Sequence, residues 1–371
     1  MLAQPPLWLV LVAFVCAIGP LVFFHELGHY LAARVFGVGA EVFSIGFGHE
    51  ITGWTDKRGT RWKVGWLPLG GYVRFVGDEE RAGQGEIDEL PKNAFAGKPV
   101  WQRFLIVLAG PVANFVLAIL IFAGFFAAFG MPSTPPVVTG IQAGGAAATA
   151  GLQIGDRIEA VAGEETESFE DVRRIVSIRP GADVTIRVER NGQMQIFHAR
   201  LGSQMEKDSF GEEFRTGLLG VFAVGQEMRS VPVLQLIPEA TRYTYTLTAT
   251  TIVGLKQIIA GERSFNDAGG PVKIAQIAGQ QALLGPLHFV QLLALLSINL
   301  GFINLLPVPV LDGGHLLFYT VEAVRRRPMS IQAQEWAFRG GLALLLALLL
   351  FTTVNDLGSF GVWERLGRLI G

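Results

Sequence analysis

Long apolar runs dominate the chain, and four of them reach or approach the roughly 20 residues that a helix needs to cross a bilayer. They extend from Pro5 to Ala33, from Phe104 to Phe129, from about Phe289 to Leu311, and from Gly340 to Asn355. The last run is the shortest and predicts a short or tilted span. The pattern therefore predicts a polytopic α-helical membrane protein with about four transmembrane helices.

The Lys and Arg residues between these runs predict an orientation, because cytoplasmic loops carry an excess of both. Ten of them lie between Arg34 and Arg103, and Arg325, Arg326, Arg327 and Arg339 lie between the third and fourth runs. We expect both of these segments on the cytoplasmic side. Both termini and the segment 130–285 then face outward.

The outer segment contains a compact α+β pattern. A short helix closed by glycine precedes an alternating strand over 157–161, and Ser168 is placed to cap a helix that extends to Ile178. Two further alternating segments flank Asn191-Gly192, which is a strong hairpin signal. The stretch AATAGLQIGDRIEAVAGE and this order of elements resemble a PDZ domain of the bacterial type. We assign that domain to 131–202.

Two other loop segments are expected to lie at the membrane surface. In 203–285, the stretch 236–259 has apolar residues at helical spacing interrupted by charges, which favours an amphipathic helix on the membrane over a span. Residues 203–235 match no pattern. In the inner loop, alternation and two glycines within about 60–76 predict a membrane-associated β-hairpin, or one that only touches headgroups.

Composition supports this organisation and excludes other classes. Half of the 371 residues are hydrophobic and only 17% are charged, against about 25% charged residues in an ordinary soluble protein. The formal net charge of -2 provides no basic field for nucleic acid. The single cysteine cannot form an intrachain disulfide.

The first apolar run contains His25-Glu26-Leu27-Gly28-His29, an HExxH sequence. On a helix, the two histidines share one face and can bind one metal ion, with Glu26 in reach of the ion's water as general base. Burying these three side chains in a span is costly, so an inert role is disfavoured. A polar contact between helices is the alternative.

Catalytic zinc requires a third protein ligand and an open position. The third run ends at Asp312, which the predicted topology places at the same membrane depth as His25 and His29. His315, one turn further along, is the rival ligand. His49, His198 and His288 lie in loops or at the outer edge and are expected to be surface residues.

Three motifs together resemble the site-2 protease family of intramembrane zinc metalloproteases: HELGH, AGPVANF at 109–115, and NLLPVPVLDGGH at 304–315. The resemblance implies that His25, His29 and Asp312 bind one Zn²⁺ and that Glu26 is the catalytic base. It also implies that Asn304 and the β-hairpin residues contact the substrate; the latter are Gly70, Gly71, Tyr72 and Val73.

The same resemblance implies a cellular setting. The protein would lie in a bacterial inner membrane, with the termini and the PDZ domain in the periplasm, and spans in 1–130 and 286–371. Its substrates would be single-span membrane proteins, such as an anti-sigma factor already cut by a site-1 protease, or signal-peptide remnants. Relatives carry two tandem PDZ domains, whereas this chain has room for one, which puts a size filter based on two domains in doubt.

Two other protein classes remain as alternative interpretations of the sequence. A metal or proton transporter would also place His, Glu and Asp inside spans, but usually shows inverted repeats, and none is evident here. An inactive membrane scaffold that displays a PDZ domain would not require an intact HExxH sequence.

Overall fold

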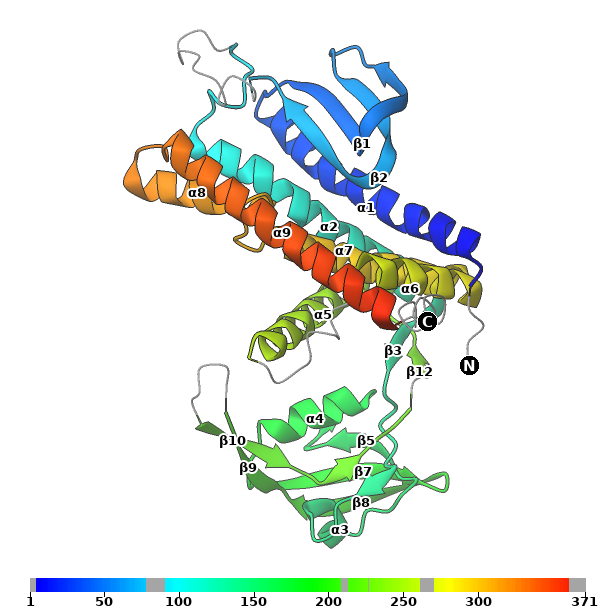
Figure 1. The fold of residues 1–371 in the computed structure, drawn as a ribbon. Coiled ribbons are helices and arrows are strands. Elements are labelled where there is room, and N and C mark those ends of the chain that lie inside the picture. Colours follow the sequence, from blue (N-terminus) through cyan, green and yellow to red (C-terminus); the bar gives the residue numbers. More distant parts are fainter. Residues whose placement is uncertain (1–4, 78–90, 208–212, 226, 261–269, 360–371) are drawn as a thin grey trace, which may run out of the picture. The chain divides into compact units, whose positions relative to one another are not determined.

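The computed structural model describes residues 5–77, 91–207, 213–225, 227–260 and 270–359. The chain forms two compact units, one made of Met1–Gly124 with Ile237–Gly371 and the other of Phe125–Leu236. Figure 1 labels most of the elements of both units.

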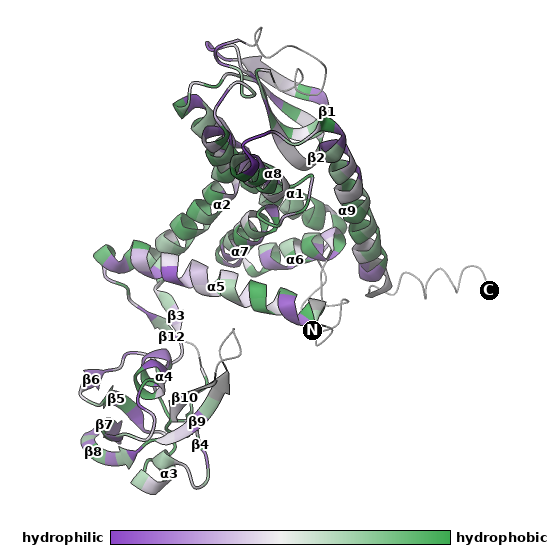
Figure 2. Cartoon of the chain, turned by 90° about the vertical axis from the view of Figure 1, so that its left-hand side faces the viewer, coloured by the Kyte–Doolittle hydropathy of each residue, from purple (hydrophilic) through white to green (hydrophobic). Residues whose placement is uncertain are grey.

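The first unit is built on four helices that are long and apolar enough to cross a membrane, counted over the described residues. They are α1 (Leu7–Val35), α2 (Val100–Phe129), α7 (Pro286–Asn304) and the Ile331–Asp356 part of α9 (Ile331–Ser359). Figure 2 shows the hydrophobic residues that dominate α2 and α9. The predicted number of spans is thus matched by helices of sufficient length, and the fourth is longer than the sequence pattern indicated.

The third span ends earlier than predicted, which is a correction. The apolar run continues to Leu311, but α7 stops at Asn304, and Asp312 begins a separate helix, α8 (Asp312–Arg325). The intervening segment 305–311 contains Pro307 and Pro309, which lack the N–H that would continue a helix. Hydropathy alone could not separate an apolar loop from an apolar helix.

The β element of the first unit also differs from its prediction. The two strands are β1 (Ala40–Thr55) and β2 (Arg61–Phe75), joined by a turn in which Asp56 Oδ1 accepts hydrogen bonds from two backbone N–H groups. The residues predicted to form a hairpin of their own, 61–67 and 70–75, both pair with β1 instead. The hairpin is therefore wider, and begins at Ala40 rather than near residue 60.

This sheet packs against α1 through an aromatic cluster. Phe43 is 1% exposed, stacks on Trp62 at a centroid separation of 4.2 Å, and meets Tyr30 of α1 edge to face. Burial of large aromatic rings is among the strongest stabilising terms available to so small a sheet. The cluster holds β2 against the helix that carries the HExxH sequence.

Two further helices complete the first unit: α5 (Leu236–Ile259) and α6 (Pro271–Leu284). α5 is the helix predicted from the 236–259 pattern. It mixes polar and apolar residues in Figure 2 and is not among the candidate spans. α6 packs on α1, and its first turn is capped by the buried Asp356 of α9, which accepts from the backbone N–H groups of Gly270 and Lys273.

The second unit contains the two helices and the three strands predicted within 131–202. A four-stranded antiparallel sheet has the order β6-β5-β7-β8, and α4 (Phe169–Ser177) packs on it through Val172, Ile175 and Val176. Ser168 and Asp171 form a capping box at the start of α4. Its other predicted elements are α3 (Ala146–Ala150), β5 (Arg157–Val161), β7 (Asp183–Arg190) and β8 (Gln193–Arg200), whereas β6 (Glu164–Glu165) was not predicted.

The unit extends beyond its predicted end at 202. Residues that matched no sequence pattern form β9 (Gly202–Lys207), β10 (Glu213–Leu218), β11 (Val221–Phe222) and β12 (Glu227–Arg229). β11 pairs with β4 (Gly140–Ile141), and β12 pairs with β3 (Met131–Ser133). β11 and β12 are too short for a clear alternation, and their partners lie about 80–100 residues away in sequence. β9 and β10 have six residues each and pair with each other.

An ion pair between the buried Asp156 and the partly exposed Arg190 joins a turn to the end of β7 in the second unit. Asp156 is 1% exposed and accepts hydrogen bonds from Arg190 at 2.6 and 2.7 Å. Burial raises the pKa of Asp156, but the two hydrogen bonds from Arg190 and one from the Gln153 N–H outweigh it, so the pKa is lower than usual. Asp156 is therefore charged in the folded unit, and its charge depends on Arg190.

Candidate metal centre

The HExxH sequence lies on α1, where the helical spacing places both histidines on one face. His25 and His29 are each 8% exposed, and their Nε2 atoms are 3.2 Å apart. Asp312, the first residue of α8, completes the group: its Oδ2 lies 3.1 Å from His25 Nε2 and 3.3 Å from His29 Nε2. Among the described residues, these three form the one cluster of His, Cys, Asp or Glu side chains arranged to hold a metal.

The dimensions of this cluster fit zinc. Zinc binds imidazole nitrogen and carboxylate oxygen at about 2.0–2.1 Å in tetrahedral geometry, which separates neighbouring ligand atoms by about 3.3–3.4 Å. The three donor atoms form a triangle with sides of 3.1, 3.2 and 3.3 Å. Two imidazoles and a carboxylate are also a ligand set used by catalytic zinc, and they leave a fourth position open.

The Nδ1 atoms of both histidines contact residues of α2. His29 Nδ1 lies 2.9 Å from the backbone oxygen of Ile106, and His25 Nδ1 lies 3.1 Å from Asn114 Nδ2. A metal-binding histidine usually engages its second nitrogen in this way, which fixes the ring orientation. Neither Ile106 nor Asn114 was predicted from the sequence to have a role at the site.

Close packing of α1 on α2 explains much of the AGPVANF motif. A Cβ on Gly28 would fall 2.3 Å from the backbone oxygen of Ala109, and a Cβ on Gly110 would fall 2.2 Å from His29 Nε2. Real Cβ atoms do not approach other atoms this closely, so both positions require glycine. The motif is thus a surface on which the HExxH helix and one of its imidazoles rest.

Glu26 faces the sheet as well as the metal cluster. It is 8% exposed, and the backbone N–H of Val73 in β2 hydrogen-bonds to it. A Cβ on Gly71 would fall 3.1 Å from Glu26 Cγ and 2.6 Å from a methyl group of Val22. Gly71 therefore lets β2 lie directly against the turn of α1 that carries Glu26.

The segment that delivers Asp312 is tightly folded. Val310 has φ = 95°, a strained backbone conformation for a β-branched residue. Cβ atoms on Gly313 and Gly314 would fall 2.2 Å from the Leu306 oxygen and 2.6 Å from the Val308 oxygen. The two glycines after Asp312 thus allow residues 305–311 to fold over the first turn of α8.

The structure also places the predicted substrate-binding residues and the other histidines. Asn304 is the last residue of α7, and Gly70, Gly71, Tyr72 and Val73 lie on β2. His315, the rival ligand, instead packs against aromatic rings, with its centroid 5.2 Å from that of Phe338. His49, His198 and His288 are exposed, as expected.

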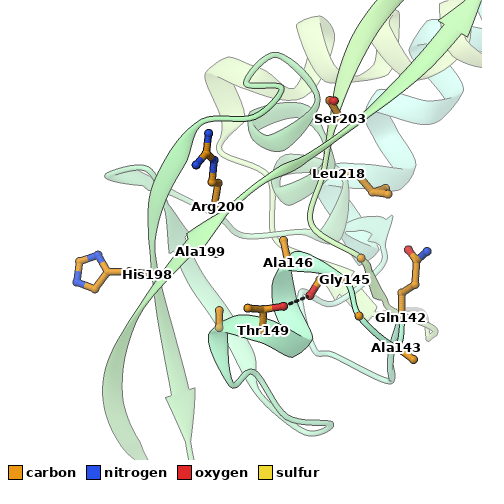
Figure 3. A pocket seen from close by; sticks show the side chains of 14 residues that line it. Gln142, Ala143, Gly145, Ala146, Thr149, His198, Ala199, Arg200, Ser203 and Leu218 are labelled. Carbon is orange, nitrogen blue, oxygen red and sulfur yellow. Dashed lines mark hydrogen bonds between the residues drawn. The ribbon is translucent and has the colours of Figure 1, made fainter.

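The second unit contains a cavity of its own, which Figure 3 shows. Its lining includes Gln142, Thr149, His198 and Arg200, and Thr149 Oγ1 donates a hydrogen bond to the Gly145 backbone oxygen. The lining residues include no carboxylate or thiol beside His198. This cavity therefore lacks the groups for metal or acid–base chemistry that the first unit brings together.

An HExxH helix with a carboxylate that is distant in sequence but adjacent in space is typical of a metallopeptidase. Comparison with known proteins agrees. The model of peptidase family M50 matches residues 13–348. The chain therefore belongs to this family, the site-2 proteases, and is a zinc metalloprotease.

Several curated relatives cover nearly the whole chain. A protein of Agrobacterium fabrum named "Putative zinc metalloprotease" is 43% identical over 361 residues, which cover 94% of this chain and 96% of that protein. Metalloprotease MmpA of Caulobacter vibrioides is 37% identical over 391 residues, covering 97% of this chain and 98% of that protein.

The similar solved structures cover a smaller part of the chain. The PDZ domain of an SdrC-like protein from Listeria monocytogenes is 20% identical and matches 24% of this chain and 85% of that domain, with a TM-score of 0.19. The HtrA-type protease AlgW with a decapeptide is 34% identical over 18% of this chain and 21% of that one, with a TM-score of 0.17.

Proposed function

We propose that this zinc metalloprotease cuts its substrates within the membrane, at one zinc ion held by His25, His29 and Asp312. The observation that carries the proposal is the triangle of donor atoms at 3.1–3.3 Å. Two of its corners lie in α1, which is long and apolar enough to span a membrane. A transporter or an inactive scaffold would not need this ligand set together with an adjacent carboxylate.

In this proposal, Glu26 is the general base and later the general acid. When bound, zinc lowers the pKa of a coordinated water to about 7 and polarises the scissile carbonyl. Glu26 follows His25 directly and is buried beside the cluster. Its carboxylate accepts the proton of the attacking water and then transfers it to the nitrogen of the departing peptide. The Val73 N–H holds that carboxylate in place.

The edge of β2 is a docking site for the substrate backbone in this scheme. Residues 71–75 pair with 40–45 of β1 along one side, and Gly71 and Val73 lie against Glu26 along the other. An extended peptide that adds to a sheet edge gains main-chain hydrogen bonds and has its carbonyl groups exposed to attack. A transmembrane helix must unwind to bind in this way. Asn304 would hold the substrate backbone or the oxyanion.

This requirement defines the substrate class. We propose single-span membrane proteins with a locally weak helix, trimmed outside the membrane by a site-1 protease, such as an anti-sigma factor, and also signal-peptide remnants. In the proposed topology, the protein lies in a bacterial inner membrane with both termini and a PDZ domain in the periplasm. The asymmetry of Lys and Arg between the loops supports that orientation.

Zinc content and zinc-dependent cleavage test the proposed function together. The purified protein should contain one zinc per chain, lose cleavage of a single-span substrate on chelation, and regain it on addition of zinc. Cleavage that persists without metal would contradict the proposal. Metal binding with no cleavage, coupled to zinc transport in vesicles, would favour the transporter reading.

A further inference from the structure

Asn114 of α2 is a buried polar residue that packing alone does not explain. It is 0% exposed, and its side-chain Nδ2 lies 3.1 Å from His25 Nδ1. Its Oδ1 has no hydrogen-bond partner among the described residues. Buried polar groups are nearly always hydrogen-bonded, so a half-satisfied amide beside a metal site calls for a chemical reason.

Which His25 nitrogen carries the proton decides which end of the Asn114 amide must face the ring. With Nδ2 toward the ring, the amide donates to Nδ1, and the ring proton then lies on Nε2, the atom 3.1 Å from Asp312 Oδ2. A histidine that binds metal through Nε2 must carry no proton there. Its proton is then on Nδ1 and needs an acceptor.

His29 shows how the neighbouring ligand meets this demand. Its Nδ1 faces the backbone oxygen of Ile106 at 2.9 Å. A carbonyl oxygen only accepts hydrogen bonds, so His29 carries a proton on Nδ1, and its neutral form presents a free lone pair at Nε2. His25 has no backbone carbonyl in the corresponding contact and faces the Asn114 amide instead.

We propose that Asn114 is a positioning residue that selects the metal-binding tautomer of His25. A rotation of 180° about the Cβ–Cγ bond exchanges the two ends of the amide and places Oδ1 where it accepts from His25 Nδ1–H. No hydrogen bond of Oδ1 to the rest of the described chain opposes that rotation. The inference rests on the proposed zinc site and adds a group that orients one of its ligands.

The backbone around Asn114 is fixed by α7. Ser297, itself 0% exposed, donates from Oγ to the Asn114 backbone oxygen at 2.8 Å. A Cβ on Gly301 would fall 3.3 Å from Asn114 Cβ and 3.1 Å from the Phe115 ring, so α7 approaches this turn of α2 closely. The Asn114 side chain can therefore rotate about its own bonds while its Cα stays in place relative to His25.

The test is the zinc affinity of three variants of the full-length protein, measured by competition with a chelator on monodisperse samples. Asn114→Leu removes the acceptor at similar volume and should weaken zinc binding about 10- to 100-fold, as for other residues that orient a ligand. Asn114→Asp keeps an acceptor at both ends and should stay within about threefold of the unmodified protein. Thr244→Val, a buried polar substitution in α5 away from the cluster, is the matched control and should leave the affinity unchanged.

Two outcomes would overturn the inference while the zinc site stands. Unchanged affinity in Asn114→Leu would show that the side chain does not orient His25. Equal weakening in Asn114→Leu and Asn114→Asp would show that the amide acts as a donor. If the unmodified protein binds no zinc, the proposed function fails as well, so the two failures are distinguishable.

A measurement on the unmodified protein covers the case in which the variants do not fold. Histidine labelled with ¹⁵N should show, in the zinc-loaded protein, His25 with a proton on Nδ1 and metal on Nε2. A His25 Nδ1 without a proton, or bound to the metal, would overturn the inference.

Discussion

The His29 ring rests directly on the backbone of Gly110, so that a Cβ at position 110 would fall 2.2 Å from Nε2 and 2.4 Å from Cε1. This contact joins the HExxH helix to α2 at the proposed ligand atom itself. Gly110→Ala should therefore displace the imidazole and lower zinc affinity by at least about 10-fold, the range seen when a ligand's support is removed. Zinc content after dialysis against a weak chelator measures the loss.

Gly124→Ala on the same helix is the control for that substitution. Nothing lies within 4 Å of a Cβ at position 124, so this variant should keep its zinc. It should gain about 0.5–1 kcal/mol from the higher helix propensity of alanine. If both alanine variants bind zinc like the unmodified protein, the packing of His29 on α2 does not constrain the site.

The assignment of the third ligand predicts different outcomes for two neighbouring residues. His25→Ala, His29→Ala and Asp312→Ala should each lose bound zinc and activity, because each removes one of three converging donor atoms. His315→Ala should keep zinc, since that ring packs among Phe318, Tyr319 and Phe338. Full metal in Asp312→Ala with loss in His315→Ala would reverse the assignment.

The ion pair in the second unit predicts a pH dependence of stability. The pKa of Asp156 is lower in the folded unit than in the unfolded chain, so around pH 4 the unfolded chain binds more protons. The stabilisation is complete above the unfolded value of about 3.9 and is lost as pH falls through the lower folded value. Hydrogen exchange of β7 and β8, corrected for the intrinsic rate at each pH, should therefore accelerate below about pH 4.

Arg190→Ala is the matched test of that ion pair. It removes the hydrogen-bond partner of the buried Asp156 carboxylate and should destabilise the unit at neutral pH by about 1–3 kcal/mol, less than for a fully buried pair because Arg190 is partly exposed. The low pKa of Asp156 should then be lost, and the acid-induced change with it. An unchanged exchange profile in this variant would show that Arg190 is not the cause.

Excising the second unit tests whether it restrains access or delivers the substrate. Ser133 of β3 lies opposite Glu227 of β12, so an Asn-Gly turn can replace residues 134–226 and close a short hairpin. We expect the variant to bind zinc and cleave a pre-trimmed substrate as before, and to cleave the untrimmed one faster. Loss of cleavage of the trimmed substrate by a folded, zinc-loaded variant would instead make the unit essential for delivery.

The parts of the site that could be predicted from sequence are those encoded by the HExxH spacing and by the predicted membrane depth of each apolar run. HExxH on one helix face and an Asp in an apolar run identified His25, His29 and Asp312 as one candidate set, and the structure brings them together. Asn114, Gly110 and the Ile106 carbonyl were missed because their roles arise only from the packing of α2 on α1. A buried Asn in an otherwise apolar run is a signal that could have drawn attention to position 114.

In the fold, too, most features set by local sequence were predicted and those set by distant contacts were not. Helices α4 and α5 and the β7–β8 hairpin were predicted because capping residues, helical spacing and Asn191-Gly192 lie close together in sequence. The extent of β1 was missed because Gly46 and Gly48, both with positive φ, interrupt its alternation. Strands β3, β4, β11 and β12 have only two or three residues each and exist through distant partners.

The most direct test of intramembrane zinc proteolysis is to map the cut. A single-span substrate, trimmed on its outer side, is reconstituted with the protein in liposomes, and the products are identified by mass spectrometry. We predict one zinc-dependent cut inside the apolar span, which disappears in Glu26→Gln while that variant keeps its zinc, because an amide cannot take up the proton. A cut outside the span, or appreciable turnover by Glu26→Gln, would contradict the account.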